Sequence, residues 1–280
     1  MKLEFIKMQA GGNDYIYVDQ TKRRTIAYPE KIAKSLSIRR FSIGSDGLVL
    51  IMPGKNADVK MRIFNADGSE AGTCGNAVRC VAKYAYDAGI VKKKTINVET
   101  LSGVKRAKIR SSDGKTSVVA VEMGRATFIP KAVPVISAKE VLLRPYRLGK
   151  KIYLMTCLNI GNPHAVITVD DYRSLSVARV GKIIENDGIF PEKTNVEFVK
   201  ILSKKEICVR VWERGSGITY SCGTGACASV VSCAVNGLVP FKRQITVHMK
   251  GGDLFVKVRH DLSVILKGEA VKVYDGAIDI

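Results

Sequence analysis

The chain has 280 residues, a length that suits two domains of ordinary size better than one compact core. Hydrophobic residues make up 46% and charged residues 25%, and no apolar run is long enough to span a bilayer, which excludes a protein with membrane-spanning helices. The formal net charge is +19, but the basic residues are spread along the chain without a nucleic-acid-binding motif. We therefore expect a soluble cytoplasmic protein with no signal peptide, no membrane partner and no nucleic-acid partner.

The first half of the chain predicts strands around one apolar helix. The opening residues 1–7 predict a strand, and a lesser helix is expected at 29–38. Val59, Met61 and Ile63 alternate with basic residues, which is typical of a strand. After Cys74-Gly75-Asn76 the apolar spacing becomes helical until Gly89. Further strands are expected at 94–99, 104–110 and 117–123.

The second half predicts the same kind of content. The stretch 125–150 contains three prolines and has weak periodicity, so we place the join between the halves near its start. A very apolar helix is expected from Ala226 to Val235, and a lesser one near 174–185. Strands are expected at 151–156, 165–169, 195–201, 207–211 and 253–267.

The two halves repeat a pattern. Arg62-Ile63-Phe64-Asn65 precedes Cys74-Gly75, and Arg210-Val211-Trp212-Glu213 precedes Cys222-Gly223, with an offset of 148 residues for both the arginines and the cysteines. Gly12-Asn13 has a counterpart in Gly161-Asn162 at an offset of 149. Few residues are identical, but the order and spacing are shared. This repeat predicts two similar domains that face each other, 1–126 and 127–268, with segment 269–280 packed on the first.

Two of the seven cysteines lie where a loop becomes a helix. The first amides of a helix have no intrahelical partner and carry partial positive charge, which favours a thiolate at Cys74 and at Cys222. The glycine after each cysteine lets a ligand approach the backbone, and free amides can bind a carboxylate. The other five cysteines are expected to pack in the interior as free thiols, and no structural zinc site or other metal site is expected, because there is no C-x-x-C and only three histidines.

A pair of such cysteines in facing domains fits few kinds of reaction. Inverting a stereocentre without a cofactor needs a base on one face of the carbon and an acid on the other, and two thiols with one ionised satisfy this. His164, held by the turn Gly161-Asn162-Pro163, either assists proton exchange or is only hydrogen-bonded at a strand start. Glu213 and Arg214 lie at the end of a strand shortly before Cys222, and Asn65 lies at the end of a strand shortly before Cys74. These matching positions favour a location of all three residues in the cleft.

These residues resemble those of the diaminopimelate epimerase family. The stretch Lys7-Met8-Gln9-Ala10-Gly11-Gly12-Asn13-Asp14-Tyr15 is similar to the opening motif of the family, and Phe64 to Ala71 with Cys74-Gly75-Asn76 and Arg79-Cys80 is similar to its first cysteine motif. The remaining similar stretches are Gly161-Asn162-Pro163-His164, Thr194-Asn195-Val196-Glu197-Phe198, Glu213-Arg214-Gly215, Ser221 to Cys227 and Val273-Tyr274-Asp275-Gly276. The matches run in order from residue 3 to residue 276.

The resemblance implies an α/β (α+β) fold of two pseudo-symmetric domains, each with strands wrapped around a central helix, and an active site in the interdomain cleft. It implies interconversion of LL- and meso-diaminopimelate in lysine biosynthesis, with no cofactor, by the acid-base pair Cys74 and Cys222. His164 and Glu213 would support proton transfer, and Tyr274 matches a tyrosine linked to homodimer formation. Substrate binding would fall to the side chains of Asn13, Asn65, Asn162, Asn195, Glu213 and Arg214, and to the backbone of Gly75, Asn76, Gly223 and Thr224.

Some positions differ from the commonest family pattern, namely Gln9, Ala10, Gly47, Ala77 and Ile218. The main alternative is a racemase of another amino acid on the same fold. Proline and hydroxyproline racemases typically have Gly-His after the first cysteine and begin the second motif with Asp-Arg-Ser-Pro, unlike this chain. Two other classes remain, a cysteine hydrolase, which would need only Cys222, and a basic binding protein, which would need neither cysteine.

Overall fold

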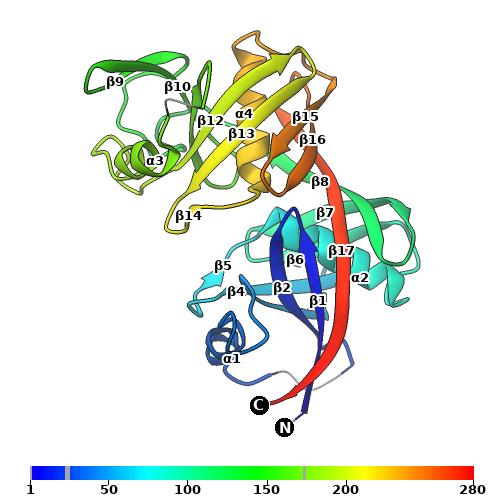
Figure 1. The fold of residues 1–280 in the computed structure, drawn as a ribbon. Helices are drawn as coiled ribbons and strands as arrows, with labels where there is room; N and C mark the ends of the chain where they lie inside the picture. Colours follow the sequence, from blue (N-terminus) through cyan, green and yellow to red (C-terminus); the bar gives the residue numbers. More distant parts are fainter. Residues whose placement is uncertain (1, 23–25, 173–174) are drawn as a thin grey trace. The chain divides into compact units, whose positions relative to one another are not determined.

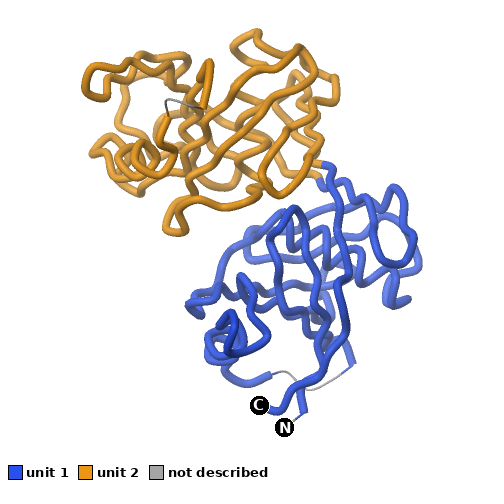
Figure 2. Tube along the Cα trace, in the orientation of Figure 1, with its two compact units in different colours: residues 1–121, 267–280 blue, residues 122–266 orange. Residues whose placement is uncertain are grey.

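A computed structural model describes residues 2–22, 26–172 and 175–280. The first residue of the expected opening strand, the basic residues 23 and 24 and residue 174 of the expected helix lie outside the described residues. The chain divides into two compact units, Met1–Val121 with Lys267–Ile280, and Glu122–Leu266 (Figure 2). The division expected from the sequence falls after residues 126 and 268.

Unit 1 is built from strands around helix α2, and its strands pair mostly with neighbours in the sequence. The pairs β1–β2, β3–β4, β6–β7 and β7–β8 are antiparallel, whereas β2–β3 and β4–β6 are parallel. The C-terminal strand returns to pair antiparallel with β1. The elements are β1 Lys2–Ala10, β2 Asn13–Asp19, α1 Pro29–Leu36, β3 Gly47–Pro53, β4 Val59–Asn65, β5 Glu70–Ala71, α2 Gly75–Asp87, β6 Thr95–Thr100, β7 Gly103–Ser112 and β8 Thr116–Arg125.

Unit 2 is built in the same way around helix α4. The pairs β10–β11, β12–β13 and β15–β16 are antiparallel, whereas β11–β12 and β13–β15 are parallel. A further hairpin, β9–β10, precedes this series. The elements are β9 Arg144–Leu148, β10 Lys151–Asn159, β11 Pro163–Thr168, α3 Val177–Glu185, β12 Asn195–Ser203, β13 Glu206–Glu213, β14 Gly217–Ile218, α4 Gly223–Val235, β15 Gln244–Met249, β16 Gly252–Val258 and β17 Ser263–Asp279, the strand that continues into unit 1.

The repeat predicted from the sequence is present in the topology. The hairpin, helix, parallel crossover and central helix of unit 1 recur in the same order in unit 2, and α2 and α4 each contain 13 residues at an offset of 148. The expected strand 253–267 is wrong as one element. It is two strands, β16 and β17, because the Asp261 side chain accepts hydrogen bonds from the backbone and hydroxyl of Ser263 and closes a turn between them.

Each central helix is enclosed by strands of its own unit (Figure 1). Helix α2 packs against β1, β4, β6 and β7, and α4 packs against β10 to β13, β15 and β16. All residues of α4 except Thr224 and Val235 are buried, which explains its nearly continuous apolar sequence. Helix α2 is also buried but carries two interior cations, Arg79 and Lys83. No helix in the described parts of the chain has the length and apolar character of a membrane span.

Helix α3 fixes the loop that follows β13. The Trp212 indole donates to Glu185 Oε2 at 2.7 Å, and the Gly215 backbone donates to Glu185 Oε1 at 2.9 Å. Gly181, one turn earlier on α3, lies directly over the Trp212 ring, because a Cβ at this position would be 2.5 Å from Trp212 Cβ. The loop carrying Glu213 and Arg214 is therefore positioned by a close helix–strand contact that only glycine permits.

We predict that Gly181→Ala destabilises the protein. Alanine improves helix propensity by about 1 kcal/mol, but forcing a methyl group against Trp212 costs about 1–3 kcal/mol and should dominate. Gly188→Ala is the matched control, because a Cβ there meets nothing within 4 Å. Urea unfolding of both variants measures the difference, and equal midpoints would contradict the packing argument.

Candidate active site

In unit 1 the predicted site residues gather at the start of α2. Cys74 occupies the N-cap position in extended conformation, with φ −142° and ψ 119°, and its carbonyl accepts the first helical hydrogen bond from Val78 at 2.9 Å. Cys74 is half-buried, and Gly75 and Asn76, which follow it, are buried. The thiol thus lies beside the first amides of the helix, where an anion is stabilised.

A chain of amide side chains supports this helix start. Asn76 Nδ2 donates to Asn13 Oδ1 at 2.5 Å, and Asn13 Nδ2 donates to Asp46 Oδ2 at 3.2 Å. Asn76 Oδ1 accepts from Arg79 Nη2 at 2.7 Å, and Arg79 Nε also donates to the Glu269 carbonyl at 3.2 Å. Two residues predicted to bind substrate are therefore in direct contact, and a fully buried guanidinium holds them.

Asn65 lies at the end of β4. Its Nδ2 donates to Ser69 Oγ at 3.0 Å across the turn that leads into β5. Asn65 pairs with Gly47 across β3 and β4, and the Ala66 amide donates to the Asp46 carbonyl at 3.1 Å. Asp46 therefore links the Asn65 turn to Asn13.

In unit 2 Cys222 occupies the corresponding N-cap position of α4. Its φ of −124° and ψ of 112° repeat the extended conformation of Cys74, and its Sγ accepts from the Gly225 amide at 3.3 Å. The Thr224 hydroxyl lies 3.5 Å from the same sulfur. Unlike Cys74, Cys222 is buried.

Burial and two acidic neighbours act on the Cys222 thiol. Burial raises the pKa of Cys222 well above its ordinary value, and the charges of Glu213 and Glu197 raise it further, against the hydrogen bonds from Thr224 and Gly225. Burial also raises the pKa of Glu213, although hydrogen bonds from Thr219 and Cys222 oppose this. The resting state of this half-site therefore favours a protonated Cys222. The thiolate expected at Cys222 from its place at a helix start is wrong, because burial and two nearby carboxylates outweigh the helix amides.

The other predicted residues of unit 2 converge on the same edge of its sheet. Asn195 Nδ2 donates to the Pro163 carbonyl at 2.8 Å, and Asn195 Oδ1 accepts from the Arg214 amide at 2.9 Å. His164 Nε2 lies 2.8 Å from Asn162 Oδ1. The Arg214 guanidinium is exposed and donates to the Glu192 carbonyl at 2.9 Å. Asn162, His164, Asn195 and Arg214 are thus joined through adjacent strand ends.

The structure adds a group for which the sequence indicated no role. Glu197 is fully buried, and its Oε1 lies 2.8 Å from His164 Nδ1. The available signal was a charged residue flanked by Val196 and Phe198, two positions after Asn195. In unit 1 the sequence likewise indicated no role for Arg79, which was only part of a stretch similar to the family motif. His164, for which two interpretations stood open, has both ring nitrogens engaged.

Neither a metal cluster nor a disulfide is found in the described structure. All seven cysteines are free, and no group of three or more His, Cys, Asp or Glu side chains among the described residues could hold a metal ion.

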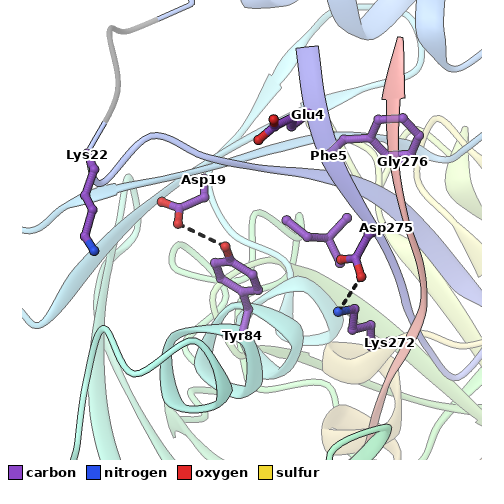
Figure 3. A pocket seen from close by; sticks show the side chains of 9 residues that line it. Glu4, Phe5, Asp19, Lys22, Tyr84, Lys272, Asp275 and Gly276 are labelled. Atoms are coloured by element: carbon purple, nitrogen blue, oxygen red, sulfur yellow. Dashed lines mark hydrogen bonds and ion pairs between the residues drawn. The ribbon is translucent and has the colours of Figure 1, made fainter. Parts of the chain in front are cut away.

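Unit 1 has a cavity of about 510 Å³. Figure 3 shows side chains that line it. Its polar groups are largely paired with one another. The Tyr84 hydroxyl donates to Asp19 at 2.9 Å, and Lys272 lies 2.6 Å from Asp275. None of the predicted catalytic or substrate-binding residues lines it, so its size alone does not make it the candidate site.

Comparison with solved structures identifies the class of fold. The structure resembles a phenazine biosynthesis protein of the PhzF family from Bacillus anthracis, with a TM-score of 0.70 and 15% identity over 100% of both chains. It also resembles a probable proline racemase from Agrobacterium radiobacter, with a TM-score of 0.71 and 15% identity over 99% of this chain and 92% of the other. The chain therefore has the two-domain α/β fold of these proteins.

Sequence comparison identifies the family. The family model described as diaminopimelate epimerase matches residues 5–129 and 156–273. Proteins named diaminopimelate epimerase are 44% identical in Acetivibrio thermocellus, over 99% of both chains, and 45% identical in Geobacillus kaustophilus, over 97% of this chain and 95% of the other. One from Methanococcus maripaludis is 43% identical over 99% of this chain and all of its own. The chain belongs to the diaminopimelate epimerase family and is an isomerase.

We predict that Glu213→Gln lowers the pH at which Cys222 ionises. The substitution keeps the shape of the side chain but removes one of the two negative charges that raise the pKa of the thiol, so the midpoint should fall by about one pH unit. The rate of Cys222 alkylation against pH, read by peptide mass spectrometry, measures it. An unchanged or higher midpoint would show that the Glu213 charge does not act on the thiol.

Proposed function

We propose that the chain epimerises LL-diaminopimelate to meso-diaminopimelate with Cys74 and Cys222 as an acid-base pair, as a step of lysine biosynthesis. The observation that carries this proposal is that the same arrangement of a cysteine and a helix occurs in both units. Each unit presents a cysteine in extended conformation immediately before its central helix. The family membership supports the substrate, and the repeat supports two thiols acting on one carbon.

The proposed reaction is a balanced exchange of protons. One cysteine, as thiolate, takes the α-proton, and the electron pair of the broken C–H bond remains on the α-carbon. The other cysteine, as thiol, gives its proton to the opposite face. The enzyme is left with the two protonation states exchanged, and exchange with solvent restores them. No electron leaves the substrate and no group is transferred, so no cofactor is required.

The helix starts also account for substrate binding in the proposal. The α-carboxylate would accept hydrogen bonds from the backbone of Gly75, Asn76, Gly223 and Thr224, where the helix dipoles favour negative charge. The same dipoles would stabilise the carbanion as it forms. The side chains proposed to hold the rest of the substrate are Asn13, Asn65, Asn162, Asn195, Glu213 and Arg214.

His164 and Glu213 are proposed to support proton transfer at Cys222. Glu213 accepts a hydrogen bond from the Cys222 thiol, and its pKa, raised by burial, brings it closer to that of a group that can exchange a proton near neutral pH. His164 is buried two residues after Asn162, which it contacts. The imidazole would reach the site through that amide.

We predict that LL-diaminopimelate incubated with the enzyme in heavy water gains solvent deuterium at one α-carbon as the meso isomer forms, under reducing conditions and without pyridoxal phosphate or metal. Cys74→Ser and Cys222→Ser should each lose at least about 10²-fold in epimerisation, because each removes one partner of the proton exchange. Deuterium content by NMR and the isomer ratio by chromatography are the measurements.

Cys233→Ala is the matched control for these variants. Cys233 is buried in α4, about three turns beyond the helix start, and should tolerate a small apolar replacement. If the Cys74→Ser variant keeps its activity and the Cys222→Ser variant loses it, only one cysteine is needed, which would indicate a cysteine hydrolase instead. If the wild type shows no exchange on diaminopimelate, a panel of amino acids read by circular dichroism would test the alternative of a proline or hydroxyproline racemase.

We also propose that the enzyme is a homodimer that uses the exposed side of β17. Tyr274 is 44% and Val273 is 50% exposed, so two large apolar side chains are accessible on one strand. Close packing holds this strand against β1, because a Cβ at Gly276 would lie 2.5 Å from the Phe5 ring.

We predict that Tyr274→Ala shifts the protein toward the monomer in sedimentation velocity at micromolar concentration, because truncation removes apolar area from the proposed interface. Leu101→Ala, which shortens a side chain that is 62% exposed elsewhere in unit 1, should leave the sedimentation coefficient unchanged. A wild type that sediments as a monomer would contradict the proposal.

A further inference from the structure

Glu197 carries a carboxylate in the interior of unit 2. It lies in β12, its exposed fraction is 0%, and the strand on either side of it is apolar. A buried carboxylate is costly unless it is hydrogen-bonded or paired with a charge. The groups that contact Glu197 should therefore indicate why a carboxylate is buried at this position.

One oxygen of this carboxylate holds His164. Oε1 lies 2.8 Å from Nδ1 of an imidazole that is itself fully buried. The parallel pairing of β11 with β12 brings the two residues together, since His164 pairs with Asn195 and Val166 with Glu197. An ionised carboxylate can only accept, so Nδ1 donates a proton to Oε1. Nε2 is directed at Asn162 Oδ1, 2.8 Å away, an amide oxygen that also accepts, so the ring is fixed from both sides.

The same oxygen reaches the start of α4. A Cβ added to Gly225 would lie 2.8 Å from Glu197 Oε1 and 3.2 Å from Cys222 Sγ, so the carboxylate and the sulfur both lie close to one point. Gly225 is the residue whose amide donates to that sulfur. The absence of a side chain at this position is what lets the carboxylate and the thiol approach.

The second oxygen has no hydrogen-bond partner within the described structure. Oε2 of Glu197 is buried and unpaired, so the imidazole alone does not account for this carboxylate. The titratable groups around the Cys222 thiol come from three strands, His164 on β11, Glu197 on β12 and Glu213 on β13. The charge of Glu197 adds to that of Glu213 in opposing a thiolate at Cys222.

We propose that Glu197 is a positioning residue of the Cys222 half-site, whose carboxylate holds the Nδ1–H group of His164 and keeps Cys222 as the thiol of the resting enzyme. Its role in catalysis rests on the epimerisation proposed above. The resting enzyme then presents Cys222 as the proton donor. His164 in turn holds the Asn162 amide. The buried carboxylate of Glu197 therefore acts on both the proposed acid, Cys222, and a residue proposed to bind substrate, Asn162.

The test uses Glu197→Gln, which keeps an acceptor for His164 but removes the charge. The pH midpoint of Cys222 alkylation in the free enzyme should fall by about one unit, as expected when a nearby like charge is removed. Glu206→Gln is the control. Glu206 is another glutamate of unit 2, but it is exposed at the opposite end of β13 from Glu213 and is not among the charges that raise the pKa of Cys222, so its variant should leave the midpoint in place.

A second measurement needs no variant. The chain has only three histidines, so the His164 ring is readily assigned in long-range ¹H–¹⁵N spectra of the wild type. We expect Nδ1 to be protonated at neutral pH. A ring with a bare Nδ1 would overturn the proposal, and so would a Cys222 midpoint that is the same in Glu197→Gln as in the wild type.

These readouts separate the two proposals. Both are made on the enzyme without substrate, and deuterium exchange on diaminopimelate is measured beside them. Exchange with an unmoved midpoint would reject the role of Glu197 alone. A lowered midpoint without exchange by the wild type would reject the epimerisation, and the positioning role in that reaction with it, while the contact between Glu197 and Cys222 would stand. A loss of stability without a change in midpoint would show that Glu197 is only structural.

Discussion

The structure depends on one local constraint, an extended cysteine followed at once by a helix. A helix leaves its first amides without partners, and a residue in the N-cap position must satisfy them or present them to something else. In both units that residue is a cysteine followed by glycine, and in unit 2 the cysteine sulfur itself accepts a hydrogen bond from one of these amides, that of Gly225. Burial of the rest of each helix among the strands of its own unit makes this start rigid.

The two central helices differ in the charges that are buried on them or beside them. Helix α2 carries the buried cations Arg79 and Lys83, whereas the positions 148 residues later on α4 are Cys227 and Val231. Around Cys222 the buried charges are instead the carboxylates of Glu197 and Glu213. The proposed reaction needs one thiol ionised and the other not, and the carboxylates beside Cys222 favour the protonated form of that partner.

The local sequence pattern was sufficient to predict the helices and the repeat. It was insufficient where a feature depends on contacts between residues that are distant in the sequence. The cysteine and glycine at each helix start are adjacent in sequence, so the sequence revealed them. Asp261 closes a turn within an alternating apolar stretch that contains no glycine or proline, so the sequence suggested one strand instead of two. Glu197 and His164 are 33 residues apart and meet only through a parallel strand pairing. A glutamate within a strand indicates a solvent-facing position until the helix that covers it is known.

The recurrence of one strand order in two halves with few shared residues has an evolutionary consequence. Backbone hydrogen bonds specify the order of the strands, and they place few demands on which side chains the strands carry. Once such a fold exists in two copies, each copy can diverge in polarity without loss of architecture. An asymmetric reaction can then arise from a symmetric ancestor, because specialisation requires only substitutions at the helix starts and the strands beside them.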